Sequence, residues 1–413
     1  MVFLGLTLAT LGRGQDAPAA PEADRIVIEE IRLHGLSRTE PDYVLELLGC
    51  PLPCRLAAPD DLRRLEHRLL RTHLFHEVHA DVAGTTLHLH LRERWSPVLA
   101  PFATLDGWRE RYGLAYLDAN LRGRGELLVL VGELVDGGAG LESKLVLPQV
   151  FDEDLGLVVR TTTGRYRRAE LGVRGAGAEE RLVDGHEVDL LGILAGPLWA
   201  FGVLHVNPRL GVSSVKANPY LGFEVPAGGM DLVFRLHLEF DARRDEGSPQ
   251  GTGPCGRLVL GGGSLAGGYG LAEAWIEEVF PSWHSLVLTL RAALGAGLNL
   301  PEYELARLGG PAGEVPLRGR ERESLWGDQY AVVGLELART LFTHNLGTLT
   351  ALVFHDHGAA VRSEWSSDRR SAASGGGLRM YLTRIAVPAM GLDLSYSHEL
   401  GTLLASATLG ARF

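Results

Sequence analysis

The chain has 413 residues, of which 46% are hydrophobic, 22% are charged and 53 are glycine, and its formal net charge is −11. This length suits a small domain followed by a large one. The lack of a strongly basic cluster argues against a nucleic-acid partner. No segment approaches the roughly 18 uninterrupted apolar residues of a membrane helix, so a membrane location would require strands that alternate apolar and polar residues.

The N-terminal segment combines an apolar run, Met1 to Leu11, with an Ala/Pro-rich tract that extends to Ala23. An apolar run followed by small residues is typical of a secretory signal peptide, although no Lys or Arg precedes the run here. We therefore expect residues 1–23 to be a signal peptide and a short linker. The alternative is an ordinary N-terminal strand.

Residues 24–96 are expected to fold as a small α+β domain with the element order β-α-α-β-β. The predicted elements are a strand from Ile26 to Gly35, a helix over Pro41–Leu48, a second helix that begins at Asp60, and strands over His76–Val82 and Leu87–Leu91. The second helix is predicted because leucines recur along one of its faces after a Pro-Asp-Asp start.

Two of the three cysteines, Cys50 and Cys54, bracket a Pro-Leu-Pro turn in this domain. A disulfide between them is expected if the domain lies in an oxidising compartment. Two reduced thiols beside a turn are the alternative. A zinc site would need two more ligands at the right place.

The seven histidines of this domain raise the question of a metal site, because His88 and His90 share one strand face and His76 and His79 lie close by in the sequence. A solvated strand surface explains them more simply, so we predict no metal and no cofactor. The chain shows no nucleophile–base pair and no carboxylate dyad. Its Gly261-Gly262-Gly263 run lacks the lysine of a phosphate-binding loop. An enzyme is not expected.

After a linker predicted over residues 97–111, segments with alternating apolar and polar residues recur throughout 112–413. In Asp231–Asp241, for example, Leu232 and Phe234 face one way and Arg235 and Glu239 the other. A soluble sandwich would also alternate. We favour an all-β antiparallel transmembrane barrel because the segments run ~9–11 residues and their polar faces carry charges, as a wet lumen permits.

The barrel is predicted to have sixteen strands, an even number as in bacterial antiparallel barrels. The first strand is expected near Tyr112 and the last near Thr402, with three strands beginning near Glu187, Leu198 and Ala217. The last strand carries a C-terminal signal of apolar residues at Leu409 and Phe413.

A long non-periodic segment, Asn299 to Gln329, joins the predicted strands eleven and twelve. A connection of about thirty residues is uncommon unless it is functional or disordered. It contains Leu317-Arg318-Gly319-Arg320, and the next alternating strand carries Phe354, Asp356 and Gly358 at every second position. We expect the Arg318 guanidinium to pair with the Asp356 carboxylate inside the barrel. In the alternative, an exposed loop arginine and a lumen aspartate never meet.

These motifs, in this order, resemble the BamA/TamA superfamily. Leu70–Val78 is similar to the loop before the second strand of a POTRA (polypeptide-transport-associated) domain, with His73 where glycine is usual. Leu317–Arg320 resembles the superfamily's Val/Ile-Arg-Gly-Tyr/Phe loop except for its final aromatic. Phe354, Asp356 and Gly358 match its Phe/Gly-x-Asp-x-Gly partner motif in full.

The resemblance implies a bacterial outer-membrane location with the POTRA-like domain in the periplasm. It also implies insertion of outer-membrane proteins or protein secretion. The implied partners are the outer-membrane bilayer, an unfolded outer-membrane or secreted client, and periplasmic chaperones or accessory proteins. A passive channel or structural anchor that keeps the same scaffold is the alternative function.

Overall fold

The computed structural model describes residues 25–57, 60–70, 72, 74–94, 97–106, 109–152, 155–174, 179–219, 228–243, 251–280, 286–311, 315–344, 347–362, 365–382 and 388–410. The predicted signal peptide and linker at residues 1–23 lie outside them. The chain divides into two compact units, Met1–Ser96 with Asn120–Gly125, and Pro97–Ala119 with Glu126–Phe413.

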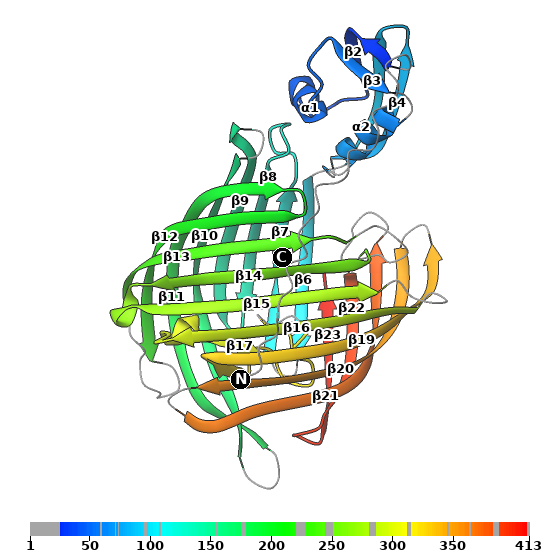
Figure 1. Cartoon of the computed structure of the whole chain (residues 1–413). Coiled ribbons are helices and arrows are strands. Elements are labelled where there is room, and N and C mark those ends of the chain that lie inside the picture. Colours follow the sequence, from blue (N-terminus) through cyan, green and yellow to red (C-terminus); the bar gives the residue numbers. More distant parts are fainter. Residues whose placement is uncertain are drawn as a thin grey trace, which may run out of the picture. The chain divides into compact units, whose positions relative to one another are not determined.

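The first unit contains two helices and five strands among its described residues (Figure 1). They are β1 (Arg25–Ile28), β2 (Glu30–His34), α1 (Pro41–Leu48), β3 (Cys54–Ala57), α2 (Asp60–Leu70), β4 (Phe75–Ala83) and β5 (Thr86–Glu93). β1 and β3 pair with each other, whereas β2, β5 and β4 form a separate sheet in that order. β2 runs parallel to β5, and β4 runs antiparallel to it.

The β1–β3 pair is absent from the predicted β-α-α-β-β order, because the first predicted strand is in fact two. Ile28 ends β1 fully buried, and Ile31 faces the core from β2. Side chains alternate along a continuous strand, so two residues three positions apart cannot share a face. The break at Glu29 resolves this conflict and sends the two halves to different partners.

Both helices bury one face against the sheets. Pro41 occupies the first turn of α1, where its missing N–H leaves no hydrogen bond unmade, and Gly49 ends the helix in the left-handed region at φ +59°. The largest fully buried side chains of this unit are Ile28, Leu48, Leu69, Phe75, Leu87 and Leu89. Among the described residues, no helix is long and apolar enough to cross a membrane.

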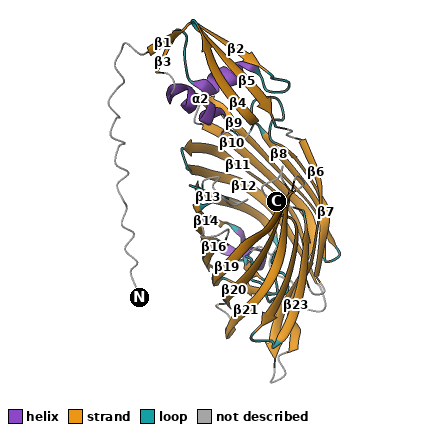
Figure 2. Cartoon of the chain, turned by 90° about the vertical axis from the view of Figure 1, so that its right-hand side faces the viewer, coloured by secondary structure: helices purple, strands orange, loops and turns teal. Residues whose placement is uncertain are grey.

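The described part of the second unit contains sixteen strands that close into one antiparallel barrel (Figures 1 and 2). They are β6 (Pro97–Asp106), β7 (Arg109–Asp118), β8 (Leu127–Val135), β9 (Gly138–Asp152), β10 (Leu155–Arg174), β11 (Glu179–Phe201), β12 (Leu204–Pro219), β13 (Gly229–Asp241), β14 (Gly253–Gly263), β15 (Tyr269–Phe280), β16 (Leu286–Leu298), β19 (Gln329–His344), β20 (Gly347–Arg362), β21 (Trp365–Leu382), β22 (Pro388–Ser397) and β23 (Thr402–Leu409). The predicted sixteen-stranded barrel is confirmed.

Alternation along the strands separates an apolar outer surface from a polar interior. On β13, Leu232 is 65% exposed and Phe234 is 43% exposed, whereas Asp231 between two outward residues is fully buried. The same pattern repeats on β20, where Val353 faces outward beside the buried Asp356. Transmembrane barrels have this arrangement, in which an apolar outer band faces lipid and the interior is polar.

The linker predicted at residues 97–111 is wrong, because Pro97–Asp106 is the first barrel strand. The strand contains Pro97 and Pro101, and proline cannot donate a hydrogen bond to a ladder. β6 pairs along its length with β7 but meets β23 only through Ala103–Asp106 among the described residues. Within the described ladders Pro101 pairs only with β7, a position that tolerates proline.

The sixteen predicted strands contain one false strand that offsets the missed β6. The segments expected near Glu187 and Leu198 belong to one strand, β11, which continues through a Gly-Pro pair. The β11–β12 ladder skips from Ala195 to Trp199 there. The Asn207 side chain of β12 donates to the Pro197 carbonyl oxygen at 2.5 Å, so a side chain replaces the missing backbone pairing.

The carboxylate of Glu93, at the end of β5, holds the segment that leads into α1. It accepts hydrogen bonds from the Ser37 hydroxyl and from the backbone N–H groups of Arg38 and Thr39, the last at 2.7 Å. Burial of Glu93 opposes its ionisation, but these donors outweigh that effect and hold its pKa at about 2, below the ordinary 4.5.

This low pKa predicts a pH-dependent contribution of Glu93 to the stability of the first unit. A depressed folded-state pKa contributes stability that is complete above the unfolded pKa of about 4.5 and is lost as pH falls toward 2. Glu93→Gln should therefore raise amide hydrogen exchange in residues 37–48 of the full chain at pH 6, and the difference should vanish near pH 2. Equal exchange in both proteins at pH 6 would contradict the anchor.

Candidate functional site

The long connection between β16 and β19 is an ordered loop with its own small elements. It contains a 3₁₀ turn (Glu302–Glu304) and the two short paired strands β17 (Ala306–Leu308) and β18 (Leu325–Gly327). Leu308, Leu317 and Leu325 are buried in one cluster with lumen-facing residues of the barrel wall. This packing places the loop inside the barrel.

Arg318 is the central side chain of the loop, and only 3% of it is exposed. Its Nε donates to Asp356 Oδ2 at 2.6 Å and its Nη2 to Asp356 Oδ1 at 2.9 Å, which is a bidentate pair. Its Nη1 donates to Glu336 Oε2 at 2.7 Å. The guanidinium carbon lies 3.6 Å from the centroid of the Phe354 ring, so the cation also stacks on an aromatic face.

Asp356 is fully buried and serves a second arginine. Arg291 Nη2 lies 2.9 Å from its Oδ1 and 3.0 Å from its Oδ2. The Arg318 backbone N–H also donates to the carboxylate, at 3.2 Å. The guanidinium groups of Arg291 and Arg318 are thus paired with the carboxylates of Asp356 and Glu336. These pairings offset the free-energy cost of removing the charges from water.

Strand register explains how Arg291 reaches Asp356 from two strands away. Arg291 on β16 is opposite Gly334 on β19, and Gly334 is opposite Asp356 on β20. A Cβ atom at position 334 would collide with Arg291 Nε and lie 2.8 Å from Asp356 Oδ1. The glycine therefore opens the space that the ion pair occupies.

The remaining motif residues shape the loop around this pair. Gly319 turns the chain at φ +82°, and a Cβ there would collide with Ala373 of β21. Gly358 leaves room for Leu317, whose methyl carbons would lie 3.0 Å from an added Cβ. Leu317, Gly319, Phe354 and Gly358 therefore act as spacers that let the two charged groups meet.

Arg320 and Arg322 extend the contacts of the loop to two other parts of the wall. Arg320, where the motif has an aromatic residue, is buried and donates through Nε to the Ser371 hydroxyl of β21 at 3.2 Å. Arg322 Nη2 donates to Asp136 Oδ2, at the turn between β8 and β9, at 2.9 Å. The loop thus contacts β21 on one side of the barrel closure and the β8–β9 turn on the other.

A second anchor holds the beginning of the loop. The buried carboxylate of Asp231 on β13 accepts the Tyr303 hydroxyl at 2.5 Å and the Tyr269 hydroxyl at 2.8 Å. Beside it, Arg235 Nη2 donates to Glu304 Oε2 at 2.7 Å. The loop is therefore fastened at its start as well as at its tip.

The barrel closes between β23 and β6 through a short seam. Four residue pairs, from Ser406↔Asp106 to Leu409↔Ala103, form its described ladder, whereas β6 and β7 share ten.

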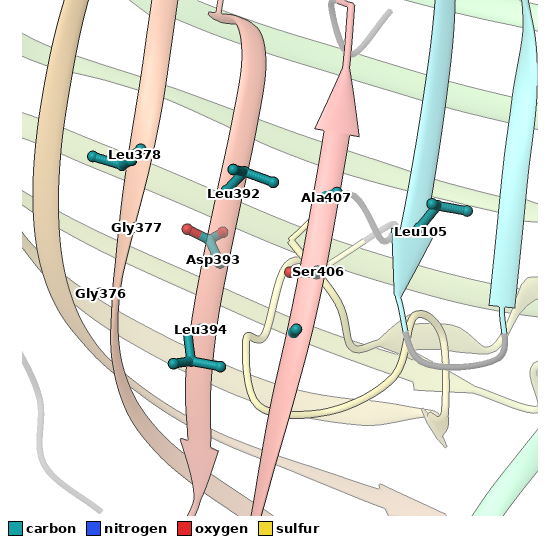
Figure 3. Close-up of a pocket in the computed structure, with 10 residues that line it drawn as sticks. Leu105, Gly376, Gly377, Leu378, Leu392, Asp393, Leu394, Ser406 and Ala407 are labelled. Carbon is teal, nitrogen blue, oxygen red and sulfur yellow. The ribbon is translucent and has the colours of Figure 1, made fainter.

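The outer wall beside the seam has a hollow of about 500 Å³, and Figure 3 shows the side chains that line it. Its rim is made by Leu105, Leu378, Leu392 and Leu394, and small residues such as Gly376, Ala405 and Ala407 line it.

The other predicted site residues lie apart from the loop. Leu409 ends β23 at the seam, and Phe413 lies outside the described residues. Cys50 and Cys54 are joined by a disulfide, with their Cα atoms 5.8 Å apart. Within the described residues, no three His, Cys, Asp or Glu side chains converge as a metal site.

Sequence reasoning missed Arg291, Arg322, Asp136 and the role of Glu336. A weak signal existed for Arg291, because it is the single charged residue of β16. Asp136 has φ +49° in a tight turn. Nothing in the local pattern connects that turn with Arg322, which is 186 residues away.

No protein-family profile matches the chain, and no curated protein matches it. Solved structures do. BamA from Haemophilus ducreyi lacking POTRA domains 1–3 aligns with a TM-score of 0.63 at 14% identity, over 93% of this chain and 84% of that chain. CdiB from Acinetobacter baumannii gives 0.61 at 12% identity, over 94% and 74%. CdiB from Escherichia coli gives 0.56 at 12% identity, over 95% and 92%.

The fold of this chain is therefore the one seen in the BamA and CdiB structures. This agrees with the resemblance that the sequence motifs carried. In this BamA-type barrel the interior loop lies against β19, β20 and β21, and its arginine tip contacts the inward face of each.

The shared carboxylate predicts unequal effects of removing the two partners. Asp356→Asn leaves Arg291 and Arg318 with Glu336 alone, whereas Arg318→Met leaves Asp356 paired with Arg291. We expect Asp356→Asn to destabilise the barrel by roughly 3–5 kcal/mol and Arg318→Met by less, because stranding buried charge is the larger cost. The melting temperature in detergent, read from heat-modifiable migration in gels, measures both.

The double variant should cost less than the sum of the single variants, since it strands fewer charges. Arg379→Met is the matched control: it breaks the lumen pair with Asp393, 2.7 Å long, that joins β21 to β22. It should leave the protease resistance of residues 315–328 unchanged. Additive single effects, or loop cleavage in the control as well, would show that the Arg318 pair does not hold the loop.

The register argument predicts that Gly334 cannot carry a side chain. Gly334→Ala should displace Arg291 from Asp356 and lower the melting temperature. Gly132→Ala on β8 is the control, because nothing lies within 4 Å of a Cβ built there. If the Arg291→Met background reduces the loss of melting temperature caused by Gly334→Ala, the clash with Arg291 Nε contributes to that loss. Equal losses in both backgrounds would reject this cause.

Proposed function

We propose that this protein is a bacterial outer-membrane barrel that acts on unfolded client proteins, inserting them into the membrane or secreting them across it. The observation that carries the proposal is the combination of a four-pair seam with an interior loop tied to strands on both sides of it. BamA and CdiB share the barrel fold. Their low identity to this chain leaves the function to be argued from the site.

The proposed location rests on the outer surface and on the disulfide. The strands present leucines and other apolar side chains outward and charges inward, which suits a lipid bilayer. The Cys50–Cys54 disulfide suits an oxidising compartment such as the periplasm, where the first unit would lie.

We propose that the first unit is a POTRA domain and that its β2 edge receives an extended client strand. β2 and β4 are the two edges of the described three-stranded sheet. The Glu66 carboxylate of α2 accepts the Ala80 N–H of β4 at 2.8 Å, which occupies that edge. β2 then remains as the edge whose backbone groups can pair with an added strand.

The loop would keep the barrel in shape while the seam between β6 and β23 opens. Arg320 and Gly319 hold it to β21, on one side of the seam, and Arg322 holds it to the β8–β9 turn on the other. With four pairs, the seam has the shortest of the described barrel ladders and would need the fewest backbone hydrogen bonds to break. A client strand could replace them one for one, because backbone hydrogen bonds lost at the seam are regained with the client.

The proposal is tested by locking the seam. Thr104 and Thr408 are directly opposite across it, so Thr104→Cys with Thr408→Cys should form a reducible cross-link. In liposomes, the unlocked protein should speed the folding of a urea-denatured outer-membrane barrel protein. Oxidation should reduce that rate to the rate of empty liposomes, and reduction should restore it.

The matched control is Ser143→Cys with Thr161→Cys, a facing pair on β9 and β10 away from the seam. Its oxidation should leave the rate unchanged, which also controls for the native disulfide. Equal loss in both cross-linked proteins would reject seam opening. No acceleration by the parent protein, with a steady ion conductance insensitive to the seam cross-link, would favour the passive channel or anchor.

A further inference from the structure

We propose that the exposed face of the β2-β5-β4 sheet binds a transition-metal cation, with Zn²⁺ as the probe ion, through His34 and His88. These residues belong to the histidine group that the sequence left as a solvated surface. The inference concerns the first unit by itself and does not depend on the proposed function.

The sheet brings together two imidazoles that are 54 residues apart in the chain. His34 ends β2 and His88 lies on the neighbouring strand β5, and His34 Nε2 is 3.2 Å from His88 Nδ1. Two nitrogens bound at 2.0–2.1 Å to one tetrahedral Zn²⁺ would be roughly 3.4 Å apart. The two ligand atoms are therefore already near the separation that a shared cation requires.

A third imidazole lies within reach. His90, next to His34 in the parallel register, stacks on it with ring centroids 4.8 Å apart. His90 Nε2 lies 3.4 Å from the Asp81 carboxylate. A carboxylate on one ring nitrogen is the usual outer partner of a metal-bound histidine, and it leaves His90 Nδ1 for the cation after a ring rotation.

The charges around the pair also favour a cation. Asp81 is directly opposite His88 on β4, and Glu30 lies on the same face. Arg32 is the nearby positive side chain, and its Nε is engaged by Glu30 at 2.9 Å. Three converging ligands are not present in the described residues, so we infer a two-histidine site that water and the rotated His90 complete. Imidazole ligands suit zinc, copper and nickel.

Titration of the full-length protein in detergent with ZnCl₂ tests this site. Calorimetry should show one saturable site per chain in the parent protein. His34→Asn with His88→Asn should weaken binding at least ~10-fold, as loss of a metal ligand or its support does. His90→Asn should weaken it by less. His67→Asn, an exposed histidine on α2, is the matched control and should leave the affinity unchanged.

Copper provides a readout that does not depend on affinity. With one equivalent of Cu²⁺, the electron paramagnetic resonance spectrum of the parent protein should show at least two nitrogen ligands, and the His34/His88 double variant should lose that signature. Zn²⁺ affinity and the copper spectrum both unchanged in the double variant would overturn the proposal. All of these histidines are solvent-facing, so circular dichroism should confirm that each variant folds.

Discussion

The barrel interior depends on one buried carboxylate. Asp356 is fully removed from solvent, yet it accepts hydrogen bonds from two guanidinium groups and from a backbone N–H of the loop. A buried carboxylate without partners would be too costly to keep ionised. Arg291 of the wall and Arg318 of the loop share this compensation, so the loop supplies part of what stabilises Asp356. Asp356 in turn compensates the buried Arg318 guanidinium, and this pair couples the loop to the wall.

The way the loop is fastened follows from the barrel's own hydrogen bonds. Strands in a closed barrel use their backbone hydrogen-bonding groups to pair with their neighbours, so an inserted segment must be held mainly by side chains. The loop uses arginines for this purpose because a guanidinium can span to carboxylates, hydroxyls and carbonyls at several angles. Arg318, Arg320 and Arg322 alternate along the chain and reach three different regions of the wall. The loop thus links separate regions of a barrel wall whose seam has four described residue pairs.

The proposed mechanism uses one strand edge in each unit. Among the described strands β2 pairs only with β5 and is an edge of the small sheet, and the described ladder at the barrel seam has four pairs. Both are places where a strand of another chain could satisfy hydrogen bonds that this chain leaves open. The covered β4 edge, where Glu66 binds Ala80, illustrates the opposite case. Free and occupied edges in one small sheet favour a direction for client entry.

Much of this protein could be predicted from local patterns in its sequence. Period-two alternation predicted the strands, and the length of the segments with the charges on their polar faces favoured a barrel over a soluble sandwich. Spacing at every second residue placed Phe354, Asp356 and Gly358 on one face, and the Arg-Gly tip identified the loop that meets them. The strand β6 was predicted as part of a linker, and whether its prolines fit a strand depends on neighbours that its own sequence does not reveal.

Only the tertiary structure decided which charged side chains pair with each other. Arg291 joins Asp356 across Gly334 because three strands align in register, and Arg322 finds Asp136 because the barrel closes on itself. The approach of His34 to His88 arises in the same way, from the parallel pairing of β2 with β5. Alternation is a property of one strand and can be read locally. Register and closure are relations between distant strands, set by the packing of the whole wall, and no local pattern encodes them.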